Sequence, residues 1–145
     1  MKASEFHEKL KNSRIKTGDV LKAIFNDERF KTEENRAKYP VAFDSNGKPK
    51  LTFESNSKTY HTYCPFPEHE KEQTKGDSFA VYNGDQTAYC YGGCMSTRPL
   101  NLVELVISLI FDKSPTIAIN SELSGQFFWP AAKFLVKHFG EELGL

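Results

Sequence analysis

The sequence is poor in cysteine and has no long hydrophobic run. Its 145 residues include three cysteines, an odd number that cannot form a complete set of disulfides. The longest apolar run, residues 102–111, is interrupted by Glu104 and is far too short to span a bilayer. The N-terminal stretch MKASEFHEKLKNSR is polar and lacks the apolar segment of a secretory signal. We therefore expect a cytoplasmic protein without membrane contact, in which the cysteines stay reduced and bind a metal.

The chain also lacks an excess of charge of either sign. Lys plus Arg and Asp plus Glu are equal in number, so the net charge is zero. The distribution is uneven, because residues 1–50 carry 12 basic and 8 acidic side chains, a net +4, and the remainder carries −4. Any contact with nucleic acid must therefore be local, from one face or one arm of the protein.

Signatures of catalysis are missing as well. The sequence has no Gly-x4-Gly-Lys-Ser/Thr phosphate loop, and His7-Glu8 lacks the second histidine of a His-Glu-x-x-His zinc protease motif. The acidic pairs Glu33-Glu34 and Glu141-Glu142 stand isolated in polar stretches, whereas two-metal phosphoryl transfer needs clustered carboxylates. We find no active site in this chain, so any enzymatic role would be that of an accessory part.

One pattern stands out against these absences, a metal-ligand set of the form C-x4-H-x20-C-x3-C. It uses all three cysteines and consists of Cys64, His69, Cys90 and Cys94. Two close pairs of soft ligands on two turns are what a tetrahedral, structural zinc site needs. His61 lies near Cys64 and is an alternative fourth ligand, unless it faces solvent from a strand. Four protein ligands leave no open position for water, so we expect one structural Zn²⁺ without a hydrolytic role.

Hydrophobic periodicity and turn signals predict the elements around this site. Residues 17–26 have the apolar spacing of a helix, with Thr17 or Asp19 as a possible cap. Two β-prone runs, 78–82 and 86–90, flank Asn83-Gly84 and predict a tight hairpin, because both turn positions tolerate positive φ. Short β-prone runs also lie at 41–43, 50–53 and 58–63, the first two around the turn signal 44–47. Asn101 and Glu104 resemble a capping box that opens a helix to about residue 111, and a last helix, 129–140, should pack on the sheet.

Aromatic and basic residues near the cysteines are candidates for binding single-stranded nucleic acid. Such sites combine base stacking on aromatic rings with Lys or Arg contacts to phosphates. We expect the tyrosines of the predicted strands to lie on an exposed face of the sheet. The candidate DNA-binding residues are Lys58, Tyr60, Lys71, Lys75, Tyr82, Tyr89, Tyr91 and Arg98. For any one of them taken alone, an ordinary surface residue is the favoured interpretation.

The residues around the cysteines carry a family resemblance. The runs Tyr63-Cys-Pro-Phe-Pro-Glu-His69, Gly76-Asp-Ser-Phe-Ala-Val81 and Tyr89-Cys-Tyr-Gly-Gly-Cys94 are similar to the zinc-binding domain of bacterial replicative DNA primases. Weaker similarity at both ends extends the resemblance over 14–145. The family's histidine lies where this chain has Pro67, so its role is transferred to His69. The second cysteine pair is one residue wider, and the 27–57 segment is longer.

The resemblance implies an α+β fold, a zinc ribbon whose small antiparallel sheet is flanked by helices. One domain would hold an N-terminal helix and arm (1–57), the ribbon (58–95) and C-terminal helices (96–145). It would bind single-stranded template DNA during primer synthesis, while a primase catalytic domain or polymerase, with a helicase as a further partner, performs the chemistry. The divergence suggests a virus, plasmid or other mobile element. Two alternatives remain: an adaptor that docks on a polymerase, helicase or replication initiator, and a redox or metal sensor with a labile site.

Overall fold

The computed structural model describes residues 1–67, 76–92, 98–120 and 125–145. Within these ranges the chain has an α+β fold around a four-stranded antiparallel sheet in the order β1-β2-β3-β4. The strands are β1 (Thr59–Thr62), β2 (Phe79–Tyr82), β3 (Thr87–Cys90) and β4 (Leu100–Asn101). The α-helices are α1 (Ala3–Asn12), α2 (Thr17–Phe25), α3 (Glu33–Arg36), α4 (Leu102–Ile110), α5 (Pro115–Ile119) and α7 (Phe128–Leu143), with 3₁₀ turns η1 (Glu28–Lys31) and η3 (Gly125–Phe127).

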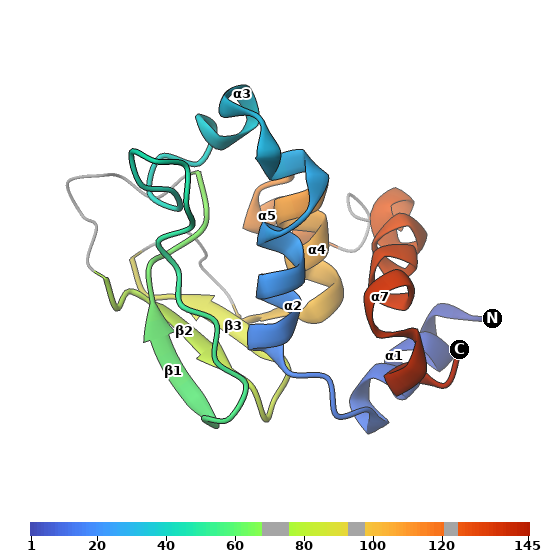
Figure 1. Ribbon diagram of the computed structural model, residues 1–145. Coiled ribbons are helices and arrows are strands. Elements are labelled where there is room, and N and C mark those ends of the chain that lie inside the picture. Colours follow the sequence, from blue (N-terminus) through green and yellow to red (C-terminus); the bar gives the residue numbers. More distant parts are fainter. Residues whose placement is uncertain (68–75, 93–97, 121–124) are drawn as a thin grey trace.

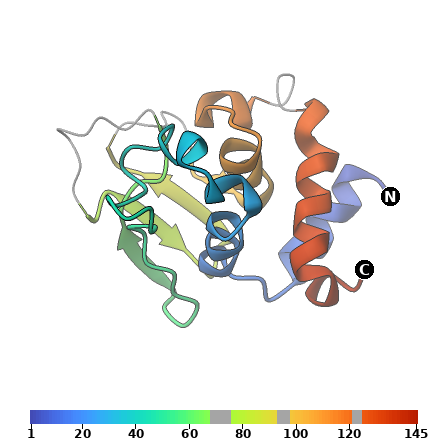
Figure 2. The same cartoon turned by 45° about the horizontal axis from the view of Figure 1, so that its top comes forward.

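The elements form three layers. Figures 1 and 2 show the sheet on one side, α2 and α4 in the middle, and α7 with α1 on the far side. The core fills the space between the layers; α4 buries eight of its nine residues and α2 buries six of its nine. Helix α4 is hydrophobic around most of its circumference, as expected of a helix with packed neighbours on two sides.

Local sequence signals account for several of these elements. The predicted helix at 17–26 is α2, whose residues Val20, Leu21, Ile24 and Phe25 are all buried. The capping box at the start of α4 is confirmed, since Glu104 N donates to Asn101 Oδ1 and Asn101 N donates to Glu104 Oε1, both at 2.9 Å. The turn at 44–47 is also confirmed, with one isolated antiparallel bridge between the flanking segments.

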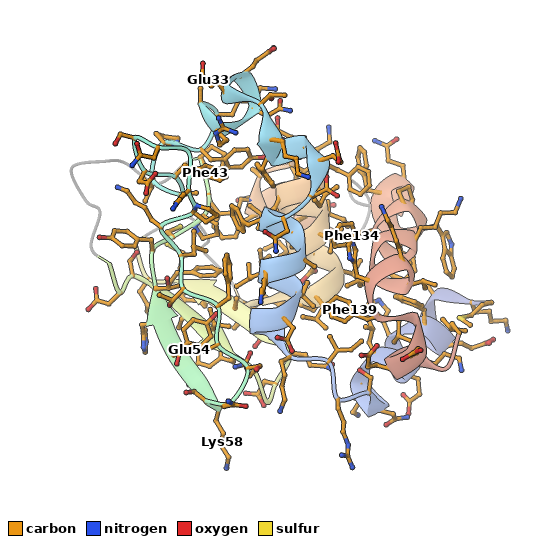
Figure 3. The ribbon with its side chains drawn as sticks, viewed as in Figure 1. Glu33, Phe43, Glu54, Lys58, Phe134 and Phe139 are labelled. Atoms are coloured by element: carbon orange, nitrogen blue, oxygen red, sulfur yellow. The ribbon has the colours of Figure 1, made fainter. Side chains whose placement is uncertain are left out.

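Three sequence predictions about the helices are wrong. Neither Thr17 nor Asp19 caps α2; Lys16 is the N-cap residue and offers no side-chain hydrogen bond. Helix α7 begins at Phe128, so Pro130 is its third residue and not its first, and the helix ends at Leu143 after a kink at Phe139. It packs mainly on α4 and α1 instead of the sheet, and Figure 3 shows Phe134 and Phe139 on the side of α7 toward α4.

The β2–β3 hairpin is confirmed, but its predicted turn is wrong. The strands pair from Phe79↔Cys90 to Tyr82↔Thr87, which leaves a four-residue loop, 83–86. The left-handed conformation falls on Gln86, with φ of 56°, and not on Asn83 or Gly84. Asn83 is instead 2% exposed, and its side chain bonds to the backbone of Gly18, Glu54 and Ser57. These tertiary hydrogen bonds outweigh the local preference for a two-residue turn.

Candidate metal centre and nucleic-acid face

Cys90 ends β3 on the inner face of the sheet. The strand alternates half-buried and buried side chains, and both Ala88 and Cys90 point into the core. The backbone N–H of Gly92 donates to Cys90 Sγ at 3.3 Å. A hydrogen bond to sulfur favours the charged thiolate over the thiol, and the thiolate is the form that binds metal. The tight turn after β3 is therefore compatible with Cys90 as a zinc ligand.

Cys64 approaches the same region from β1. Side chains alternate along β1, so that Tyr60 and Thr62 are buried, and Cys64 continues this pattern beyond the strand at 0% exposure. Thr62 lies opposite Phe79, which in turn lies opposite Cys90. The ring of Phe66 packs edge-on against Phe79 at 5.5 Å, so the chain after β1 folds over β2. The two thiols thus lie on one face and at one end of the sheet.

The other two predicted ligands, His69 and Cys94, lie outside the described residues. Among the residues that are described, no group of three or more His, Cys, Asp or Glu side chains is placed to hold a metal. The donor chemistry of the described half nevertheless fits zinc, because two buried thiols from two separate turns supply two soft ligands. The complete four-ligand set stays a prediction.

The alternative with His61 as a ligand is not compatible with the fold. His61 lies on β1 between the buried Tyr60 and Thr62, so its side chain is on the opposite, outer face and is exposed. Cys64 and Cys90 are on the inner face, with the sheet between them and His61. The expectation that His61 faces solvent from a strand is confirmed.

Three tyrosines gather on the outer face of the sheet. Tyr82 and Tyr89 are half-buried, and Tyr91 is 66% exposed. The hydroxyls of Tyr82 and Tyr91 are hydrogen-bonded at 2.7 Å, and the rings of Tyr89 and Tyr91 meet edge-to-face at 4.8 Å. The hydrogen bond to Tyr91, followed by burial, raises the pKa of Tyr82 to about 12. We call Tyr82, Tyr89 and Tyr91 the tyrosine cluster; it covers Ala80, which is fully buried on this face.

Tyr60 does not belong to this cluster, and its predicted exposure is wrong. It is 7% exposed on the inner face, and its hydroxyl donates to the carbonyl of Thr52 at 3.0 Å. Burial raises its pKa above the ordinary tyrosine value. A base cannot stack on a ring that lies inside the core, so Tyr60 has a structural role.

The predicted cations are placed differently from one another. Lys58 is exposed at the start of β1 and extends away from the body of the protein (Figure 3). Arg98 forms a two-pronged ion pair with Glu104, with N–O distances of 2.7 and 2.6 Å, so its guanidinium is already engaged. Lys71 and Lys75 lie outside the described residues. Of the four, the structure offers Lys58 as an available surface charge.

A second group of cations, which the sequence analysis did not single out, lies beside the β2–β3 loop. Lys11, Arg14 and Lys16 come from the end of α1 and from the linker between α1 and α2, more than sixty positions from the hairpin. Figure 1 shows this linker next to the end of the hairpin. The only signal in the sequence was the net +4 of residues 1–50, which does not say where those charges gather.

Comparison with known proteins adds no further constraint. No protein-family model, no curated protein and no solved structure matches this chain. In the described ranges, no helix has both the length and the apolar character needed to cross a membrane. The resemblance to primases therefore remains a prediction that depends on the residues quoted above.

Proposed function

We propose that this protein is a zinc-ribbon module that binds single-stranded template DNA during primer synthesis. Cys64, His69, Cys90 and Cys94 would hold one zinc ion, which supplies a closed, structural crosslink. The paired strands form a rigid sheet that presents its outer face to the bases. Nucleotidyl transfer belongs to a separate primase catalytic domain or polymerase.

The observation that carries this proposal is the tyrosine cluster on the outer face. Helices α2 and α4 cover the inner face, and none of the described helices lies over the outer face (Figure 1). Exposed aromatic rings on an open sheet are a common platform for single strands, because every base has a face that can stack. The edge-to-face contact of Tyr89 and the hydroxyl bond of Tyr82 fix the ring of Tyr91, so little side-chain entropy is lost on binding.

The adaptor alternative is favoured by a different observation. The net charge of zero gives no general attraction to a polyanion, and Trp129 is 43% exposed on α7, away from the sheet. Aromatic side chains at the surface are also common at the centre of protein–protein contacts. If the protein is an adaptor, it should bind a polymerase, helicase or replication initiator through Trp129 and show no affinity for DNA.

Fluorescence anisotropy with a labelled single-stranded oligonucleotide tests the proposal. We expect binding at low salt that weakens as salt rises. Tyr91→Ala should weaken binding about 5- to 150-fold, since one stacked base contributes ~1–3 kcal/mol. Trp129→Ala is the matched control, an exposed aromatic on another layer, and should leave DNA affinity unchanged. Absence of binding at low salt, or equal losses in both variants, would contradict the proposed function.

A further inference from the structure

A polar hollow of about 640 Å³ lies between the α1–α2 linker and the β2–β3 loop. Lys11, Arg14 and Lys16 line it from one side, and Asp85 and Gln86 line it from the other. Lys11 and Arg14 are exposed, and Lys16 is half-buried. The hollow is thus a recess that opens to solvent and has three cations along one wall.

Within the described residues, the three cations of this recess take part in no ion pair. In the part of the chain that the structure describes, the ion pairs are Arg29–Asp112, Lys31–Glu28 and Arg98–Glu104, and none of them involves the three cations. Among the described residues that line the recess, Asp85 is the one carboxylate. Three positive charges against one negative charge produce a local positive potential in a protein with no net charge.

The recess is held in shape by hydrogen bonds between its two walls. Gln86 Nε2 donates to Ser13 Oγ at 3.2 Å and to the carbonyl of Ile15 at 3.0 Å. Thr17 Oγ1 donates to the carbonyl of Tyr82 at 3.1 Å, and Gly18 N donates to Asn83 Oδ1 at 2.8 Å. The backbone of the linker is therefore fixed relative to the hairpin, so a ligand has to order only the side chains of the cations.

Strand β2 connects the recess to the tyrosine cluster. Tyr82 belongs to the cluster, and the next residue, Asn83, begins the loop that lines the recess. Lys58 lies at the same end of the sheet, since its carbonyl accepts from Asn83 N at 2.9 Å. Aromatic rings for bases and cations for phosphates are the two components of a single-strand site, and here the rings lie on the β2–β3 hairpin while the cations lie beside its loop.

We infer that this recess binds the phosphate backbone of a DNA single strand whose bases stack on the tyrosine cluster. This inference rests on the proposed function and adds to it the residues that bind the phosphates of the strand. Lys11, Arg14 and Lys16 contact the phosphates, Lys58 extends the same positive surface, and the α1–α2 linker is part of the binding site. An acidic peptide would also meet the cations, but a DNA single strand offers both phosphates for the cations and planar bases for the tyrosine rings, so the two features together favour a nucleic acid strand.

The salt dependence of binding measures this contribution. The triple variant Lys11→Gln, Arg14→Gln and Lys16→Gln is compared with Lys38→Gln, Lys133→Gln and Lys137→Gln, which removes three exposed charges elsewhere. Binding of an unstructured oligonucleotide is followed by anisotropy between 50 and 300 mM salt. For single strands each lost phosphate contact reduces the slope of log affinity against log salt by about 0.7. We expect a reduction of about 2 in the slope and about 100-fold weaker binding at 0.1 M salt, with little change in the control.

The possible results separate the inference from the function on which it rests. If the wild type binds and Tyr91→Ala weakens binding, but the recess variant keeps the wild-type slope, the inference is overturned and the proposed function stands. If the wild type does not bind a single strand at low salt, both fail. A duplex of the same sequence that binds as tightly as the single strand, with the same loss in the recess variant, would also overturn the inference. Thermal unfolding of both triple variants verifies that they are folded.

Discussion

Asn83 is the residue whose replacement tests the fold of the candidate site most sharply. Its buried side chain connects three separate segments of backbone. Oδ1 accepts from Gly18 N at the start of α2, and Nδ2 donates to the carbonyls of Glu54 and Ser57, at 2.9 and 2.7 Å. Asn83→Ala removes all three hydrogen bonds and leaves the hairpin attached to α2 through the Thr17–Tyr82 bond and to the α1–α2 linker through Gln86.

The cost of this change follows from the burial of the three partners. The bond to Gly18 N is buried, so the orphaned N–H costs ~1–3 kcal/mol. The two carbonyl partners are part-buried and can be rehydrated, so each costs ~0.5–1 kcal/mol. We expect the free energy of unfolding to fall by about 3 kcal/mol. For 145 residues, at an unfolding entropy of about 2.1 cal/mol/K per residue, the melting temperature should fall by about 10 °C.

Urea and thermal unfolding followed by circular dichroism, at fixed zinc and under reducing conditions, measure this loss. Asn12→Ala is the matched control, because Asn12 is exposed at the end of α1 and makes one long 3.5 Å contact with Glu8. It should change stability by less than about 0.5 kcal/mol. If Asn83→Ala also stayed within 0.5 kcal/mol of the wild type, Asn83 would not join these segments, and the argument for a fixed recess would fail.

Three further predictions concern the surroundings of the sheet. Gly18→Ala should lower the free energy of unfolding by more than about 2 kcal/mol in urea, because a Cβ there would collide with the carbonyl of Glu54. Gly84→Ala is the control and should be nearly neutral, because its Cβ meets open space. Equal losses of stability in the two variants would contradict the predicted collision. Between pH 10 and 12 the folded protein keeps the Tyr82 proton that the unfolded chain loses, so the free energy of unfolding should fall as pH rises. The fall should be smaller in Tyr91→Phe, which lacks the hydroxyl that raises the pKa of Tyr82. Identical pH profiles of unfolding in the two proteins would refute this prediction. Glu104→Ala should lower the free energy of unfolding by about 2 kcal/mol, because it removes the capping box and the ion pair with Arg98. Glu142 is exposed, so the control Glu142→Ala should change stability very little.

The elements that sequence reasoning predicted well are those with a local cause. The apolar period of α2 and the capping box of α4 act within a few residues, so they can be read without knowing the fold. The same is true of β2 and β3, which flank a turn signal. By contrast, β4 has only two residues and is a strand because the edge of β3 pairs with it. Two residues are too few for a strand pattern in the sequence, so β4 could not be predicted.

The candidate site was predictable only in part, for a similar reason. Alternation along a strand divides residues between two faces but does not say which face meets the core, and this is why Tyr60 was expected outside. The apolar stripe of α7 likewise predicts that the helix packs on something but not on which element; it packs on α4 and not on the sheet. The recess joins Lys11, Arg14 and Lys16 to a loop far along the chain, and only the three-dimensional fold brings them together.

Zinc content is the measurement that bears most directly on this account. Native mass spectrometry of protein purified under reducing conditions should show one zinc ion per chain, displaced only by strong chelators. Cys90→Ser and His69→Ala should each lose the metal or bind it much more weakly, whereas His61→Ala, on the opposite face, should retain it. A wild-type chain that binds no zinc even after refolding with the metal, or a His61→Ala variant that loses it, would contradict the proposed centre.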